Sequence, residues 1–346
     1  MATTSTTNPA SIAYAMQTYF SRKLLDYIRP VLVLAQFGSP HPLPKSQGSM
    51  TMRMFRYGSP SIAAVKELAE GVPIAEAEYR ELTMERIEVP LKQYGQVVAI
   101  TDILDDIGLF NDIEQAVKTN GEDAALKCDT VIRNELAIYA NADTGGAGDG
   151  YVDYTRKSLV YAQAATTYAG VYNGGTASAN YVLTAADLLD AATALKVASC
   201  PRIANYYVAA AAPQVTRDLM EQDDVWQRVS TYSDREQIYM GEIGKIFGVR
   251  VVETTNPFRA GATQGTFSST GTVFSTFVFG RDTYGVPALE GNSPHSPRVT
   301  VVKGADKSDP LNQIAAKVGF KTTYAAKLLQ PYWLAEIYSQ SGFAVA

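Results

Sequence analysis

The sequence predicts an α+β protein in which an extended N-terminal part precedes a body of mixed helices and strands. Alternating runs at 49–57 and 86–100 predict two strands, and an apolar helical periodicity covers 109–141. From residue 184 onward, short helices and strands follow one another in an α/β-like order. A chain of 346 residues is long enough for about two domains at roughly 150 residues each.

The composition is that of a folded protein that does not rely on bulk positive charge. Hydrophobic residues make up 46% and charged residues 19% of the chain, which excludes wholesale disorder. The net charge of −5 disfavours binding of DNA or anionic lipid as the main activity. No window approaches about 18 uninterrupted apolar residues, and the uncharged start Met1–Ser11 is not a signal peptide, so we expect no membrane segment.

The N-terminal part combines a helical pattern with an extended arm. Apolar residues recur at steps of three and four between residues 12 and 36, until Pro30 ends or kinks the helix. The segment Pro40–Pro44 alternates prolines with other residues and has few amide donors. We therefore expect it to be an arm and not a layer of a core.

The two alternating runs predict a long ribbon of two strands. Met52 and Met54 share one face of the first strand, and Ile87 and Val89 share one face of the second. Pro90 lacks an amide donor and marks a sheet edge. About thirty residues separate the strands, which is too many for a tight turn. A two-stranded ribbon is marginal alone in water, so this one must lie on another surface.

The run 109–141 predicts the longest helix, which would reach roughly 50 Å. The acids Asp105, Asp106 and Asp112 supply capping and first-turn charge at its start. The following segment, 143–181, is rich in glycine and tyrosine, and we expect a surface insertion there.

The C-terminal half predicts an α/β-like unit. We expect a helix capped by Thr184 and ending near Val197, a buried strand at 206–211, and a second helix that begins at Pro213. Further strands are expected at 249–252, 276–279, 299–303, 318–328 and 333–338.

The sequence offers no catalytic motif, because G-x-S-x-G, H-E-x-x-H and C-x-x-C do not occur. Gly241–Gly248 resembles a phosphate-binding loop, but Tyr239 and Ile246 occupy the positions of the first glycine and the hydroxyl residue. We interpret it as a turn before a strand. His41 and His295 have proline neighbours, and we interpret both as solvated bystanders.

Other candidates for chemistry are equally weak. The run Asp143–Asp149 lacks the bidentate glutamate of a calcium loop, and Asp223 and Asp224 adjoin a helical segment as solvated charges. Cys128 and Cys200 are too few for a disulfide framework or a cysteine-only zinc site, and we interpret them as buried, reduced thiols. We therefore expect no catalytic residue, no cofactor, no metal and no enzyme activity.

The order of arm, ribbon, long helix and α/β unit resembles the Hong Kong 97-type fold of tailed-phage major capsid proteins. Within that fold, the local sequence is similar to the phage N4-type major capsid protein family. The matching stretches lie between about residue 29 and residue 338 and are RPVLVLAQFG, LPKSQGSMTMRMFRY, LAEGVPIAE, LKQYGQVVAITDIL, DTVIRNEL and DPLNQIAAKVGFKTTYAAKLLQPYWLAEIYS.

The resemblance implies a division of the chain into the parts of that fold. These are an N-arm at 1–47, an E-loop at 48–100, a P-domain with the spine helix at 101–142, an insertion at 143–183, an A-domain at 184–275, and a return to the P-domain sheet and C-terminus at 276–346.

The resemblance also implies a function. It is that of a major capsid protein, made in the host cytoplasm, whose hexamers and pentamers form the icosahedral head of a tailed phage. Such a virion protein encloses double-stranded DNA without sequence-specific binding, and it works with a portal, a decoration protein and a separate scaffolding protein. We expect the scaffold to be separate because there is no room for a scaffolding domain ahead of the N-arm.

Physical reasoning supports the same picture, because an arm and a ribbon with apolar faces have few ways to bury them on one copy. Burial on neighbouring copies would offset the entropy of ordering them. The candidate inter-subunit contacts are Tyr14, Tyr19, Phe20, Leu24, Met52, Met54, Ile74, Ile87 and Val89.

Three alternatives remain at this point. An encapsulin-like compartment shell shares the fold but would enclose proteins and no genome. A soluble hydrolase that uses a pair of carboxylates belongs to a different class. A tail or decoration protein is a third alternative, disfavoured by the long central helix and the lack of repeats.

Overall fold

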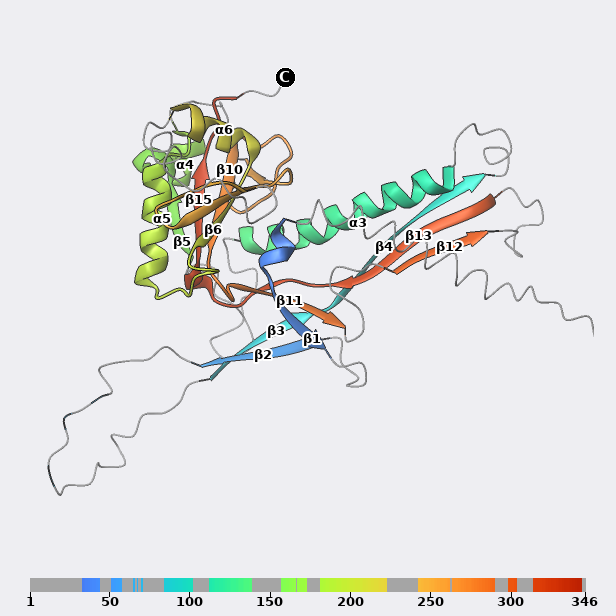
Figure 1. The fold of residues 1–346 in the computed structure, drawn as a ribbon, viewed down its shortest axis with the longest axis horizontal. Helices are drawn as coiled ribbons and strands as arrows, with labels where there is room; N and C mark the ends of the chain where they lie inside the picture. Colours follow the sequence, from blue (N-terminus) through green and yellow to red (C-terminus); the bar gives the residue numbers. More distant parts are fainter. Residues whose placement is uncertain are drawn as a thin grey trace, which may run out of the picture.

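The computed structural model shows two packed bodies and a projecting two-stranded ribbon (Figure 1). It describes residues 33–43, 51–57, 65, 67, 70, 84–101, 112–138, 157–165, 167–172, 181–222, 242–261, 263–289, 298–303 and 314–343. Most of the helix predicted between residues 12 and 36 lies outside these ranges.

The first body, the P-domain, is a long helix lying along a three-stranded sheet (Figure 1). Helix α3 (Asp112–Ala137) confirms the spine helix predicted at 109–141. The antiparallel sheet has the order β12–β13–β4 and consists of β12 (Arg298–Lys303), β13 (Ile314–Tyr324) and β4 (Lys92–Thr101).

The helix packs on this sheet because its apolar stripe meets the apolar residues that face it at every second position of the strands. Ile113 and Val117 of α3 are buried together with Val318 and Phe320 of β13. Asn120 lies on the same stripe and is fully buried, and its Nδ2 donates a hydrogen bond to the Val318 carbonyl at 3.0 Å. The helix and the sheet are therefore joined by both apolar and polar contacts.

The second body, the A-domain, is built on a seven-stranded sheet with the order β5–β15–β10–β6–β8–β7, and β9 pairs with β10. Its strands are β5 (Ser158–Tyr161), β6 (Tyr207–Ala211), β7 (Glu242–Ile246), β8 (Val249–Glu253), β9 (Phe258–Ala260), β10 (Val273–Phe279) and β15 (Leu334–Ser339). Its helices are α4 (Tyr168–Tyr172), α5 (Ala185–Val197) and α6 (Pro213–Gln222), with short 3-10 turns at Ala162–Ala164 and Pro331–Trp333.

Local sequence accounts for the start of α5, as predicted. The Thr184 side chain accepts a hydrogen bond from the Asp187 amide, and the Asp187 Oδ2 accepts one from the Thr184 amide at 2.9 Å. This reciprocal capping box satisfies two amides that the helix itself leaves free.

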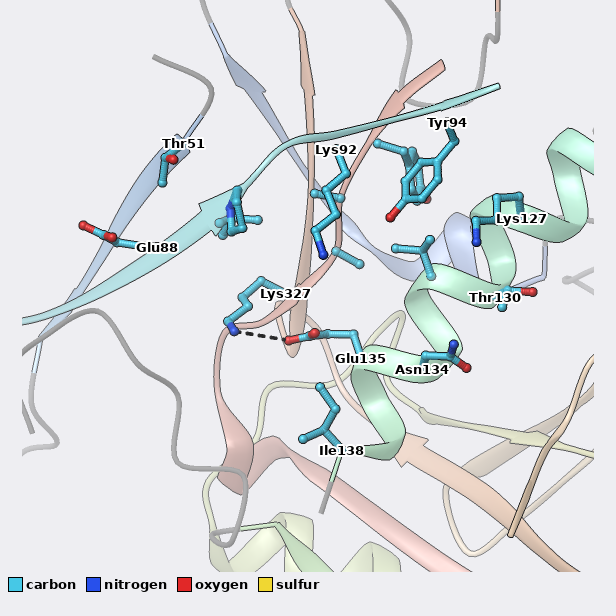
Figure 2. A pocket seen from close by; sticks show the side chains of 16 residues that line it. Thr51, Glu88, Lys92, Tyr94, Lys127, Thr130, Asn134, Glu135, Ile138 and Lys327 are labelled. Carbon is cyan, nitrogen blue, oxygen red and sulfur yellow. Dashed lines mark ion pairs between the residues drawn. The ribbon is translucent and has the colours of Figure 1, made fainter. Parts of the chain in front are cut away.

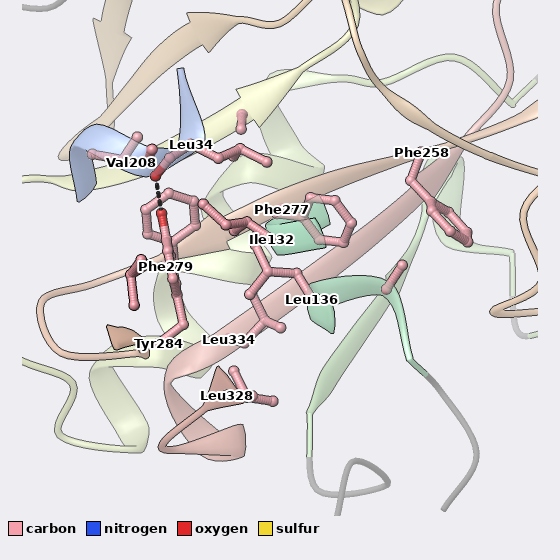
Figure 3. Packing of buried hydrophobic residues seen from close by; sticks show 14 of the residues in the cluster. Leu34, Ile132, Leu136, Val208, Phe258, Phe277, Phe279, Tyr284, Leu328 and Leu334 are labelled. Atoms are coloured by element: carbon pink, nitrogen blue, oxygen red, sulfur yellow. Dashed lines mark hydrogen bonds between the residues drawn. The ribbon is translucent and has the colours of Figure 1, made fainter. Parts of the chain in front are cut away.

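The main core lies where the two bodies meet a small third sheet. That sheet has the order β1–β11–β14 and consists of β1 (Ser39–Leu43), β11 (Tyr284–Leu289) and β14 (Lys327–Leu328). Leu34, in the 3-10 helix η1 (Leu34–Phe37), packs among Ile132, Phe279 and Tyr284, and the Tyr284 hydroxyl donates to the Leu34 carbonyl (Figure 3).

A fully buried ion pair ties the end of the spine helix to the A-domain sheet. The Lys157 Nζ lies 2.9 Å from the Glu336 Oε2 and donates to the carbonyl of Leu136, in the last turn of α3, at 2.8 Å. The cation thus also satisfies a carbonyl that the helix end leaves free.

The prediction of a single strand at 86–100 is wrong, because the segment forms two strands. It divides at Leu91 into β3 (Met84–Pro90) and β4, which belong to different sheets. Pro90 has no amide to continue a ladder, and Leu91 is buried. Only β3 pairs with β2 (Thr51–Tyr57) to form the ribbon.

The expected return of residues 276–346 to the P-domain sheet is correct only for β12 and β13. Strands β10 and β15 lie inside the A-domain sheet, where β10 pairs with both β15 and β6. Every residue of β10 and β15 is buried, as central strands covered on both faces require.

Two segments expected at the surface belong to sheets. In the predicted insertion at 143–183, β5 pairs in parallel with β15, and Lys157 and Val171 are buried. In the predicted arm, β1 pairs in parallel with β11. Strand β1 is an edge strand, which tolerates the missing amides of Pro40 and Pro42.

Candidate assembly surface

The candidate chemical motifs of the sequence form no reactive centre within the described residues. Among the described residues, no group of three His, Cys, Asp or Glu side chains could hold a metal ion. Gly244 and Lys245 lie in β7, and Phe247 and Gly248 form the turn into β8 with positive φ angles. This bears out the predicted turn and adds a strand before it. His295, the run 143–149 and the pairs at 105–106 and 223–224 lie outside the described residues.

Both cysteines are buried and unoxidised, as interpreted from the sequence. Burial raises the pKa of the Cys128 and Cys200 thiols to about 12 in each case, because the thiolate would lose its hydration. Neither thiol is therefore activated as a nucleophile. No helix in the described part of the chain is long and apolar enough to span a bilayer.

The inner face of the ribbon packs on the body of its own subunit. Met52 stands opposite Val89 and Met54 opposite Ile87, and all four belong to or pack against the main core cluster. Arg56, on the same face, donates to the Leu329 carbonyl at 2.7 Å and pairs with Glu85. The inner face of the ribbon is thus held on its own subunit.

This packing corrects part of the predicted contact set. Ile87 and Val89 expose only 2% and 1% of their surface in a single subunit, so they have no area to offer a neighbour. The alternation of apolar and polar residues identified the apolar face but not the surface that covers it. Met52 and Met54 are half-buried on that same face. Tyr14, Tyr19, Phe20, Leu24 and Ile74 lie outside the described residues.

The outer face of the ribbon carries large apolar side chains that nothing in the described subunit covers. Phe55, Tyr57 and Met84 are 57%, 62% and 55% exposed. Tyr57 and Met84 are a cross-strand pair, and Phe55 lies diagonally from Met84 on the same face. Arg53 and Glu88 form an exposed ion pair beside them, at 2.9 Å. We call Phe55, Tyr57 and Met84 the ribbon patch.

Sequence reasoning missed the ribbon patch although one signal was present. The patch shares its strand face with the charged residues Arg53, Arg86 and Glu88. Exposed aromatic residues among charged ones are typical of an interaction surface, whereas the uninterrupted apolar face marks the core.

A groove of about 600 Å³ lies at the base of the ribbon, between α3 and the β3–β4 bend (Figure 2). Lys92 of β4, Lys127 of α3 and Lys327 of β14 reach it from three directions (Figure 2). Val89, with Tyr324 and other apolar residues, forms part of its wall.

Three lysines and two glutamates, Glu88 and Glu135, line the groove. Glu135 accepts a hydrogen bond from the Leu328 amide at 3.3 Å and pairs with Lys327 at 3.8 Å (Figure 2). Lys127 lies over the Tyr94 ring at 4.9 Å, and no ion pair of Lys92 or Lys127 forms within the described residues.

Comparison with known proteins relates this architecture to virus shells by structure alone. No family model matches the chain, and no curated protein matches its sequence. The capsid of Ralstonia phage GP4 superposes with a TM-score of 0.62 at 12% identity, over 91% of this chain and 92% of that one. The capsid of cyanophage Pam1 gives 0.62 at 16% identity, over 89% of each chain.

A compartment shell is a more distant match. An encapsulin complex from Synechococcus elongatus gives a TM-score of 0.53 at 10% identity, over 90% of this chain and 89% of that one. The chain therefore has the Hong Kong 97-type fold predicted from its sequence, with the α+β architecture of phage capsid structures.

Proposed function

We propose that this chain is the major capsid protein of a tailed, double-stranded DNA phage and that its copies assemble into the icosahedral head. The observation that carries the proposal is the end-to-end match of the fold to phage capsids, with about nine-tenths of both chains covered. A structural and non-enzymatic role is supported by the same match. The narrower similarity to the phage N4-type family stays a prediction.

The ribbon supports the assembly part of this proposal. It leaves the body as a projection (Figure 1), and its outer face exposes the ribbon patch while its inner face is held on its own subunit. Apolar surface displayed in this way is stabilised when a neighbouring copy covers it. Contacts between two different surfaces repeat around a ring or shell when the rotation between copies closes.

The proposed protein has the partners expected of a phage head. Its hexamers and pentamers form the shell, a separate scaffolding protein directs assembly, and a portal and a decoration protein complete it. The DNA is enclosed without sequence-specific binding, and the net charge of −5 disfavours tight electrostatic binding to it. The protein resides in the virion after synthesis in the host cytoplasm.

Electron microscopy of the full chain, expressed alone and together with neighbouring phage genes, tests this function. We expect closed polyhedral particles, and nuclease-protected DNA inside them when the complete set of phage genes is present. Monomers alone under every condition would contradict the proposal.

The second candidate is an encapsulin-like shell, which the weaker match to the Synechococcus complex supports. The two candidates differ in the contents of the particle. Closed particles that contain only protein cargo, in a host without phage genes, would favour the compartment over the phage head.

A further inference from the structure

The start of the described chain is seated on the spine helix by a buried carboxylate. The Leu34 amide donates to the Asp129 Oδ1 at 3.1 Å, and both residues are buried at 1% exposure. The Leu34 carbonyl in turn accepts from the Tyr284 hydroxyl (Figure 3). The backbone of Leu34 is therefore held at both its donor and its acceptor.

The other oxygen of the same carboxylate holds the A-domain. Asp129 Oδ2 accepts a hydrogen bond from the Asn256 Nδ2 at 3.1 Å, and the same nitrogen lies 3.1 Å from the Thr130 Oγ1. Asn256 lies in the segment that joins β8 to β9. One side chain of α3 thus contacts both the base of the arm and a loop of the A-domain.

The orientation of Asn256 is set from its other end. The Asn256 Oδ1 accepts from Arg133 Nη1, and Arg133 also donates to the Pro257 carbonyl. The Arg133 guanidinium lies over the Phe267 ring at 4.3 Å, which limits its movement. The hydrogen bonds therefore run in one direction, from the cation through the amide to the carboxylate.

A carboxylate is costly to bury, because it loses its hydration. Burial raises the pKa of Asp129 against the opposing effects of its hydrogen bonds and of Arg133. The side chain of Leu34 lies in the core, and its buried amide needs an acceptor, which Asp129 supplies. What the carboxylate adds is a directional link between two parts of the chain that do not share an element.

We propose that Asp129 is a latch that couples the base of the N-terminal arm to the A-domain loop at Asn256, so that neither is released without loosening the other. The latch fixes where the arm leaves the body relative to the A-domain. Its role in a shell rests on the proposed function. When the arm binds neighbouring copies, a change in how its base packs on α3 would also change how the A-domain loop packs. The coupling itself is a property of the single subunit.

Hydrogen–deuterium exchange of unassembled full-length subunits tests the latch with Asn256→Ala. This variant changes a half-buried loop side chain that makes no hydrogen bond to Leu34. We expect exchange in a peptide covering residues 33–38 to become about tenfold faster. The matched control is Thr255→Ala, an exposed neighbour in the same loop, which should leave that peptide unchanged. Unchanged exchange in Asn256→Ala would overturn the proposal.

An exchange of the two side chains tests the direction of the hydrogen bonds. Asp129→Asn places two amides together, and Asn256→Asp places two carboxylates together. We therefore expect faster exchange at 33–38 and 254–260 in both single variants. In the double variant, the new amide on α3 can accept from Leu34 and donate to the new carboxylate in the loop, which accepts from Arg133. We expect exchange within about threefold of the original protein. A double variant as fast as the faster single variant would overturn the latch.

These outcomes separate the latch from the proposed function. The exchange measurements need only folded subunits, which circular dichroism verifies for each variant. Failure to form shells would contradict the proposed function and leave the latch standing. Normal shells, together with unchanged exchange at 33–38 in Asn256→Ala, would contradict the latch and leave the proposed function standing.

Discussion

At the residue scale, charged side chains are buried where separate parts of the chain join. Lys157 and Glu336 connect the end of α3 to the A-domain sheet, and Asp129 connects α3 to the arm base and the loop at Asn256. Each group is paired or hydrogen-bonded, because an isolated buried charge would be strongly destabilising. The stability of these joints therefore depends on both partners being present.

Removing one partner of the Lys157–Glu336 pair should be costly. Lys157→Met leaves the Glu336 carboxylate buried without its cation, and we expect the free energy of unfolding to fall by about 3–5 kcal/mol. Urea unfolding measures the loss. The control is the double variant Lys157→Met with Glu336→Leu, which should recover most of it. A single variant within about 1 kcal/mol of the original protein would contradict this account.

The Asp129 carboxyl should give a defined pH dependence. Because its pKa is raised in the folded protein, the folded state binds its proton more tightly than the unfolded state does. Its contribution to stability is then greatest below the usual carboxyl pKa and declines as pH rises through the raised value. The unfolding free energy of the original protein minus that of Asp129→Asn should therefore fall from acidic to neutral pH. Denaturant unfolding of both proteins across that range measures it, and a difference that grew with pH would contradict the sign.

The sequence could indicate which ribbon face is apolar but not what covers that face. Ile87 and Val89 alternate correctly, yet they pack on their own subunit, whereas Phe55 and Tyr57 on the charged face stay exposed. The deciding contacts come from residues such as Leu328, which lie more than two hundred positions along the chain. No local pattern carries that information.

At the element scale, segments with a strong local signal were predicted and segments defined by distant pairing were not. Helices α3 and α5 follow from periodicity and capping, and β6 follows from a short buried run. Strand β5 lies in a segment rich in small residues, and it exists because β15 pairs beside it. Strand β1 is rich in proline, and it forms a strand because it pairs in parallel with the edge of β11.

The capping box of α5 offers a test at this scale. Thr184→Ala removes the side chain that accepts from the Asp187 amide, and we expect a loss of about 1 kcal/mol in unfolding free energy. Thr193→Ala, at an exposed position inside the same helix, is the matched control. It should be neutral or slightly stabilising, because alanine favours the helix. Chemical denaturation compares them, and equal losses would exclude a capping effect.

At the scale of the whole molecule, the subunit is a pair of joined bodies with a ribbon held at its base and exposed on its outer face. The inner face is stabilised within the subunit, so the ribbon keeps its direction before any neighbour arrives. A preorganised projection loses less entropy on binding than one that must first become ordered. This arrangement suits a part that repeats many times in a closed assembly.

The ribbon patch should be needed for assembly and not for folding. Burial of an aromatic side chain contributes about 1.5–3 kcal/mol, so Phe55→Ser with Tyr57→Ser should weaken each contact about tenfold or more. Sedimentation velocity should show a loss of particles, while circular dichroism shows a folded subunit. Val197→Ser, which changes an exposed apolar residue at the end of α5, is the control and should assemble normally. Equal assembly of both variants would remove the patch from the interface.

A cryo-electron microscopy reconstruction of particles formed by the full chain tests the proposed assembly and the role of the ribbon in it. We expect a closed shell in which Phe55 and Tyr57 of one subunit are buried against an adjoining subunit, while Ile87 and Val89 stay in their own core. A reconstruction in which the outer face of the ribbon contacts no other copy would contradict it, as would a failure to form closed particles under all conditions.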